Sequence, residues 1–127
     1  MNETVSTRPL TDHERGLARW MLQHGTSEAA QFIEQLARAE ATLWRCLCGC
    51  ASFNFKIADE PEAPPGVHIL GDYIVGDGED SFGLFIFESD GILSGLEVYG
   101  LAADAPQSLP NPEQLRTVDF RNCAPET

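Results

Sequence analysis

The sequence predicts an α+β fold in which an N-terminal helix pair packs on one face of a five- or six-stranded, mostly antiparallel sheet. Up to about Ala41 the apolar residues recur at intervals of three and four, as on one side of a helix. After that point they alternate with polar residues, as in strands, and short turns rich in glycine and aspartate separate the segments. Helices followed by a run of hairpin-connected strands are typical of a two-layer α+β domain.

The first helix is predicted over residues 12–24. Thr11 and Glu14 have the spacing of a capping box, which satisfies two backbone N–H groups at a helix start. Gly25 follows the last periodic position and ends the helix. The apolar positions of this helix are Leu17, Trp20 and Met21.

A second helix is predicted from Thr26 or Ser27 to about Glu40. The connection between the two helices is very short, so they must form a hairpin or a sharp corner. The apolar positions of the second helix are Ala29, Phe32, Ile33, Leu36 and Ala37.

Five strands are predicted after the helices, with a sixth closing the sheet. A tight turn at Gly49 and Cys50 joins the first two, an acidic loop over residues 59–66 follows them, and turns at 77–80 and 89–91 make an antiparallel meander of the next three. Asn111 is expected to cap one helical turn that begins at Pro112. The predicted strands are residues 43–48, 52–58, 67–75, 82–88, 92–101 and 117–120.

The chain is predicted to be one domain over residues 10–120, with a disordered tail at 1–9 and a C-terminal tail at 121–127. Its start lacks the apolar core of a signal peptide, and no apolar run reaches the length of a membrane span. We therefore expect a cytoplasmic protein with reduced thiols. Seven arginines against one lysine favour a bacterial source with a GC-rich genome.

Residues 57–115 contain no lysine or arginine but carry twelve acids, a charge equal to the net −12 of the whole chain. A field of one sign repels nucleic acid and anionic lipid and attracts cations and basic proteins. The leading hypothesis is therefore a non-enzymatic module that binds a basic protein, and nucleic acid and membrane are excluded as partners.

A binding surface is predicted on the strand at residues 92–101. If the helices cover the face with Leu96 and Val98, the opposite face presents Glu97 and Tyr99, and a tyrosine beside a charge is typical of protein interfaces. The alternative is that the chain termini cover this second face. The remaining residues of the predicted surface are Tyr73, Asp77, Glu79, Asp80 and Glu88.

A zinc site is the second hypothesis. Cys46 and Cys48 are two apart in a predicted strand and so share a face, and a turn would bring Cys50 toward them, with Cys123 or His68 as the fourth ligand. Structural zinc sites usually space their cysteines more widely, and no second pair exists here. The alternatives are that these cysteines are small core residues, or that they form a redox dithiol.

A minor enzyme built around Glu88, Glu97 and His68 is the third hypothesis. Two carboxylates on adjacent strands would supply an acid and a base. The sequence has no nucleophile elbow, phosphate-binding glycine loop or metalloprotease motif, which disfavours catalysis.

Several motifs together resemble a group of small uncharacterised bacterial proteins, over residues 10–120. They include a CxCGC hairpin and a GxLxGLEVY strand. The resemblance implies no activity. In type, though not in motif, the chain is also similar to immunity proteins of bacterial toxin systems, which are compact, acidic and short of catalytic motifs. The motifs lie at residues 11–24, 46–50, 71–73, 91–99 and 109–116.

Overall fold

The computed structural model describes residues 6–45, 49–76, 78–101 and 104–117. Within these ranges, seven strands form a single antiparallel sheet that accompanies two α-helices, so the α+β class is confirmed. The expected number of strands, five or six, is wrong. No helix in the described ranges has both the length and the apolar character needed to cross a membrane.

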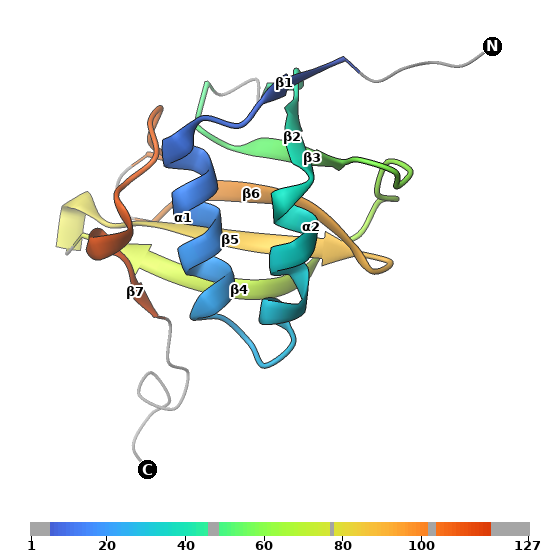
Figure 1. The fold of residues 1–127 in the computed structure, drawn as a ribbon. Helices are drawn as coiled ribbons and strands as arrows, with labels where there is room; N and C mark the ends of the chain where they lie inside the picture. The colour runs from blue at the N-terminus through green and yellow to red at the C-terminus, as the bar shows by residue number, and fades with distance from the viewer. Residues whose placement is uncertain (1–5, 46–48, 77, 102–103, 118–127) are drawn as a thin grey trace.

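The sheet combines a meander of three consecutive strands with four strands from elsewhere in the chain (Figure 1). Strands β4, β5 and β6 follow one another through short turns, as predicted, and β3 pairs with the free side of β6. In spatial order the strands are β1 (Thr7–Pro9), β2 (Ala39–Thr42), β3 (Phe53–Ile57), β6 (Ile92–Gly100), β5 (Phe82–Ser89), β4 (His68–Val75) and β7 (Arg116–Thr117).

Helix α1 (Asp12–Gln23) begins with the predicted capping box. The Thr11 hydroxyl accepts a hydrogen bond from the backbone N–H of Glu14 at 3.0 Å, and the Glu14 carboxylate accepts one from the Thr11 N–H at 2.9 Å. Arg8 donates two further hydrogen bonds of 2.8 Å to the same carboxylate, and its guanidinium contributes to lowering the pKa of Glu14 against the effect of burial. The start of the helix is therefore fixed by both backbone and side-chain contacts.

The predicted second helix is wrong in its extent. A 3₁₀ turn, η1 (Ala29–Phe32), and a short helix, α2 (Ile33–Ala37), replace it, and β2 begins at Ala39. Alanine and glutamate favour helices, but here Ala39 and Ala41 are buried in a strand that pairs with both β1 and β3. Pairing and burial outweigh intrinsic propensity at these positions.

Two neighbouring expectations also need correction. The strand predicted at residues 43–48 lies instead at 39–42; residues 43–45 belong to the connection after β2, and 46–48 lie outside the described residues. Residues 7–9, expected as part of a disordered tail, form the edge strand β1, and Leu10 after them is buried. Three residues that include a proline carry too little pattern to predict a strand.

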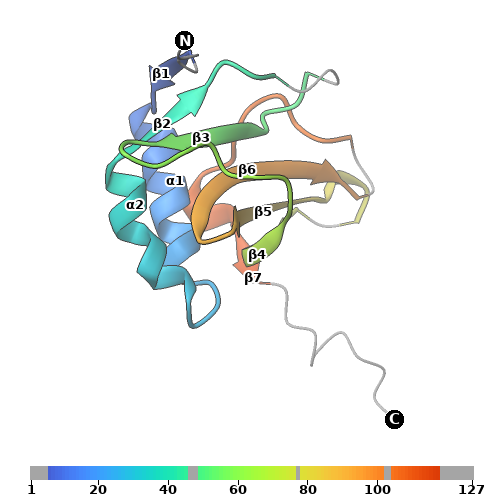
Figure 2. The same ribbon diagram turned by 90° about the vertical axis from the view of Figure 1, so that its right-hand side faces the viewer.

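Helices α1 and α2 lie side by side along one side of the sheet in both views (Figures 1 and 2). Helix α1 contacts β4 and β5, and α2 contacts β6. Tyr73 joins the two layers, because its buried hydroxyl donates a 2.6 Å hydrogen bond to the backbone carbonyl of Met21 in α1. The largest fully buried side chains of the core are Leu17, Met21, Leu22, Leu36, Ile57, Leu70, Tyr73, Leu84, Ile86, Leu93 and Leu96.

Candidate functional site

The sheet face that points away from the core carries a group of aromatic rings and carboxylates. Successive residues of a strand point to opposite faces, so fully buried Leu84 and Ile86 alternate in β5 with the partly exposed Phe85 and Phe87. The ring centroid of Phe85 lies 5.5 Å from that of Phe87 and 5.9 Å from that of Tyr99 in β6. We define the outer face as Asp72, Phe85, Phe87, Glu97 and Tyr99.

Glycines on the neighbouring strands hold two of these rings close to the sheet. Gly83 pairs with Tyr99, and a Cβ atom on Gly83 would lie 2.3 Å from the Tyr99 ring. Gly95 pairs with Phe87, and a Cβ atom there would lie 2.9 Å from the Phe87 ring. Aromatic rings that cover glycines across a strand pair are a known stabilising arrangement, so the outer face is preformed.

Two carboxylates flank Phe85 across three strands. Asp72 in β4 and Glu97 in β6 both pair with Phe85, and opposite residues in a ladder share a face. The Tyr99 hydroxyl donates a 3.0 Å hydrogen bond to Asp72. Burial raises the pKa of Asp72 above its ordinary value, with this hydrogen bond acting in the opposite direction. Burial, followed by the hydrogen bond to Asp72 and the charge of that carboxylate, raises the pKa of Tyr99 to about 12.

The structure brings together part of the predicted binding surface. Glu97 is exposed and Tyr99 partly exposed on the outer face. Tyr73 was wrongly assigned to this surface: it is 1% exposed and belongs to the core. Phe85 and Phe87, which complete the ring group, were not among the predicted surface residues.

The predicted acids do not form one patch. Glu79 and Asp80 are exposed in the 3₁₀ turn η2 (Gly78–Asp80) before β5, whereas Glu88 lies near the other end of that strand. The eight residues of β5 span roughly 25 Å at about 3.3 Å per residue, which separates the two groups. Asp77 lies outside the described residues.

A hollow of about 720 Å³ lies next to the outer face. Phe87 is part of its lining, together with the proline-rich loop after β3 and the connection after β2. Trp44 and Val67 on its wall are 50% and 59% exposed, respectively, so apolar side chains of the hollow are open to solvent. The other lining residues are Ser6, Thr42, Leu43, Asn54, Phe55, Glu62, Ala63, Pro64, Pro65, Gly66 and Ser94.

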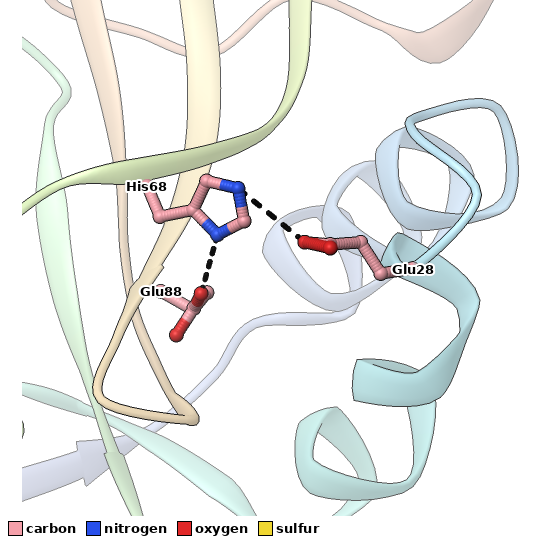
Figure 3. A group of neighbouring side chains, drawn as sticks. All are labelled: Glu28, His68 and Glu88. Atoms are coloured by element: carbon pink, nitrogen blue, oxygen red, sulfur yellow. Dashed lines mark hydrogen bonds and ion pairs between the residues drawn. The ribbon is translucent and has the colours of Figure 1, made fainter.

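A second cluster forms where β4 begins and β5 ends (Figure 3). The Nδ1 atom of His68 lies 2.5 Å from a carboxylate oxygen of Glu88, and its Nε2 atom lies 3.4 Å from a carboxylate oxygen of Glu28. The other oxygen of Glu88 accepts a 2.8 Å hydrogen bond from the Gly91 N–H. We call Glu28, His68 and Glu88 the His68 cluster.

A β-bulge in β4 creates this pairing. Gly71 pairs with Ile86, but Ile69 pairs with Phe87, so the register shifts by one residue between them. Without this shift His68 would lie opposite Ser89; with it, His68 lies opposite Glu88. Bulges commonly redirect side chains in this way.

His68 is expected to titrate above the ordinary histidine pKa of 6.5, chiefly because it forms a hydrogen bond with Glu88, and secondarily because Glu28 adds a negative charge. The protonated imidazole therefore stabilises the folded state through its contacts with the two glutamates. This contribution to the free energy of unfolding is complete below pH 6.5 and is lost as the pH rises through the raised pKa of His68 in the folded state. NMR titration of the imidazole signals in metal-free protein measures this pKa. Glu88→Gln should move it back toward 6.5, and Glu113→Gln should leave it unchanged; equal values in all three proteins would contradict the geometry.

The catalytic trio of the enzyme hypothesis does not assemble. His68 and Glu88 are in contact, but Glu97 lies opposite Phe85, three residues along β5 from Glu88. This separation is roughly 10 Å along the strand. The second carboxylate near His68 belongs to Glu28 instead of Glu97. Glu28 precedes η1 and is distant from His68 in the sequence, and no local motif predicts that the two residues meet.

The structure describes one of the cysteines proposed as zinc ligands. Cys50 is partly buried, and its Sγ atom lies 3.3 Å from the Ser52 hydroxyl oxygen. Cys46, Cys48 and Cys123 lie outside the described residues, so the proposed cysteine site stays a prediction.

No family model, no curated protein and no solved structure matches this chain. The resemblance to a group of small bacterial proteins therefore stays a prediction as well.

Proposed function

We propose that the outer face binds a basic surface of another protein, and that the protein acts as a non-enzymatic binding module. The observation that carries this proposal is a group of three partly exposed rings, in which Phe85 lies beside both Phe87 and Tyr99 and is flanked by the carboxylates of Asp72 and Glu97. Clustered aromatic side chains are the usual energetic centre of protein interfaces.

The charge of the region specifies the partner's chemistry. Strands β4, β5 and β6 belong to the segment that has twelve acids and no lysine or arginine. Such a field accelerates the approach of a basic protein and repels acidic ones. An arginine from the partner would find rings to stack on and carboxylates for paired hydrogen bonds in one place.

The environment of Asp72 supports the same function. Its carboxylate is partly buried and its pKa is raised, chiefly by burial, so the charged form is less favourable than it would be in water. A charge held in such a position is often functional rather than stabilising. A cationic partner would supply a counter-charge to this carboxylate.

The preorganised side chains of the outer face favour binding there over binding at the acidic turns. The Tyr99 and Phe87 rings already lie against glycines, so docking costs little side-chain entropy. The hollow beside Phe87 offers an adjacent apolar site for one anchoring side chain of the partner.

An arginine-rich peptide tests this proposal, with a glutamate-rich peptide of the same length as the negative probe. In an NMR titration of the full chain, the arginine peptide is expected to shift the signals of the outer-face residues. Raising the salt concentration should weaken the binding of this peptide. Glu97→Lys should weaken binding about tenfold, since it places a like charge against the peptide.

Glu113→Lys is the matched control, because it makes the same charge change at an exposed site in the 3₁₀ turn η3 (Pro112–Gln114). Its expected effect on affinity is less than threefold. Equal loss of affinity in the two variants, or shifts spread evenly over the acidic turns, would show that net charge alone attracts the peptide and that the outer face is not the site.

A further inference from the structure

The His68 cluster lies apart from the outer face and has the geometry of a metal site. One ligand atom from each of Glu28, His68 and Glu88 lies within 4.8 Å of the others. The three residues come from different elements: the residue before η1, the first residue of β4 and the penultimate residue of β5 (Figure 3). Tertiary structure therefore holds them together.

The two contacts of the imidazole differ in kind. The 2.5 Å between Nδ1 of His68 and Glu88 is a direct hydrogen bond. The 3.4 Å between Nε2 and Glu28 exceeds the usual length of an N–H···O hydrogen bond. Two ligands of a tetrahedral zinc ion, each about 2.0–2.2 Å from the metal, lie roughly 3.4 Å from one another. The Nε2 and Glu28 atoms thus have the spacing of two ligands of one ion.

Glu88 has the position of an orienting residue. A histidine that binds a metal through one ring nitrogen typically donates its other N–H to a carboxylate, which fixes the tautomer and the ring. One carboxylate oxygen of Glu88 accepts a hydrogen bond from Nδ1 of His68, and the other accepts one from the Gly91 N–H. The imidazole is thereby held with its Nε2 atom directed toward Glu28. The side chain of Glu88 is only 13% exposed, whereas that of His68 is 55% exposed.

We propose that Nε2 of His68 and the carboxylate of Glu28 bind a divalent transition-metal ion, best matched by Zn²⁺, and that Glu88 positions the imidazole. Imidazole nitrogen and carboxylate oxygen are ordinary zinc ligands, and water would complete the tetrahedron. The side chains of His68 and Glu28 are 55% and 46% exposed, so an ion reaches them from solvent. The site is independent of the proposed protein-binding function.

Zinc titration of the full chain by calorimetry tests the site, in protein whose four cysteines are all replaced by serine so that thiolates contribute nothing. We expect one zinc per chain. His68→Gln should abolish binding, and Glu88→Gln should weaken it about 10–100-fold, as is usual for an orienting partner. Glu28→Gln is a second ligand variant in an exposed connection, and it should also lose most of the affinity.

His24→Gln is the matched control, since His24 is exposed at the end of α1 and does not belong to the cluster. It should bind zinc as the parent does, and zinc should shift the imidazole NMR signals of His68 and leave those of His24 in place. Undiminished binding in His68→Gln, or no binding in the serine-substituted parent, would overturn the proposal. Circular dichroism of each variant confirms that the fold is intact.

Discussion

Replacing Gly25 by alanine is expected to lower the free energy of unfolding by about 3 kcal/mol. A Cβ atom at this position would lie 2.1 Å from the backbone oxygen of Leu70 in β4 and 3.0 Å from that of Met21 in α1. Neither backbone atom can rotate away as a side chain would. The connection would have to shift, which would also strain the 2.8 Å hydrogen bond from the Thr26 N–H to Leu70. Urea denaturation followed by circular dichroism measures the loss.

Gly16→Ala is the control for this prediction. Gly16 lies in α1, and a Cβ atom there meets nothing within 4 Å. Alanine is a better helix former, so this substitution should raise stability by about 0.5–1 kcal/mol. Similar effects of the two substitutions would contradict the close approach of the α1–η1 connection to β4.

Replacing Leu84 by alanine is also expected to have a large effect, lowering the free energy of unfolding by about 2–5 kcal/mol. Leu84 is fully buried between Tyr73 and Val98 on the core face of the sheet. Removing three carbon atoms leaves an enclosed space that the paired strands cannot close by moving. The same denaturation measurement applies.

Phe85→Ala provides the comparison, because Phe85 is the next residue of β5 and lies on the outer face. It removes more atoms than the leucine substitution, but the ring is partly exposed and its loss encloses no cavity. A smaller loss of stability than for Leu84→Ala is therefore expected, with a large loss of binding to the arginine peptide. The opposite order of stabilities would mean that the two faces have been assigned in reverse.

The parts of the fold that local signals define were predictable from the sequence. The capping box at Thr11 and Glu14 fixed the start of α1 to the residue. The β5–β6 turn was predicted from its aspartate and glycine, and Asp90 and Gly91 do adopt positive φ angles of 56° and 80°. In both places a few adjacent residues suffice to determine the backbone.

The parts that depend on long-range pairing were not predictable. Ala39 and Ala41 have helical propensity, and their place in a strand comes from partners far away in the sequence. Tyr73 and Tyr99 look alike locally, yet one lies in the core and the other on the outer face, because in both strands each face carries apolar side chains. Only the register decides which tyrosine is buried.

The candidate metal site shows the same limit. Counting residues back from the β4–β5 turn places His68 opposite Ser89, and the one-residue bulge moves it opposite Glu88. Glu28 then joins from the connection between the helices, where nothing in its sequence neighbourhood marks it as a ligand. The sequence does contain all three residues, but their proximity is a property of the tertiary structure.

The two margins of the sheet restrict how another polypeptide can attach to this molecule. The described part of β7 has two residues, and β1 has three and ends in Pro9, which has no backbone N–H to donate. An incoming extended segment would therefore gain few main-chain hydrogen bonds by pairing with β1 or with the described part of β7. Strand addition at these two short strands is disfavoured, and a binding partner there would have to rely on side-chain contacts across the broad surface of the central strands.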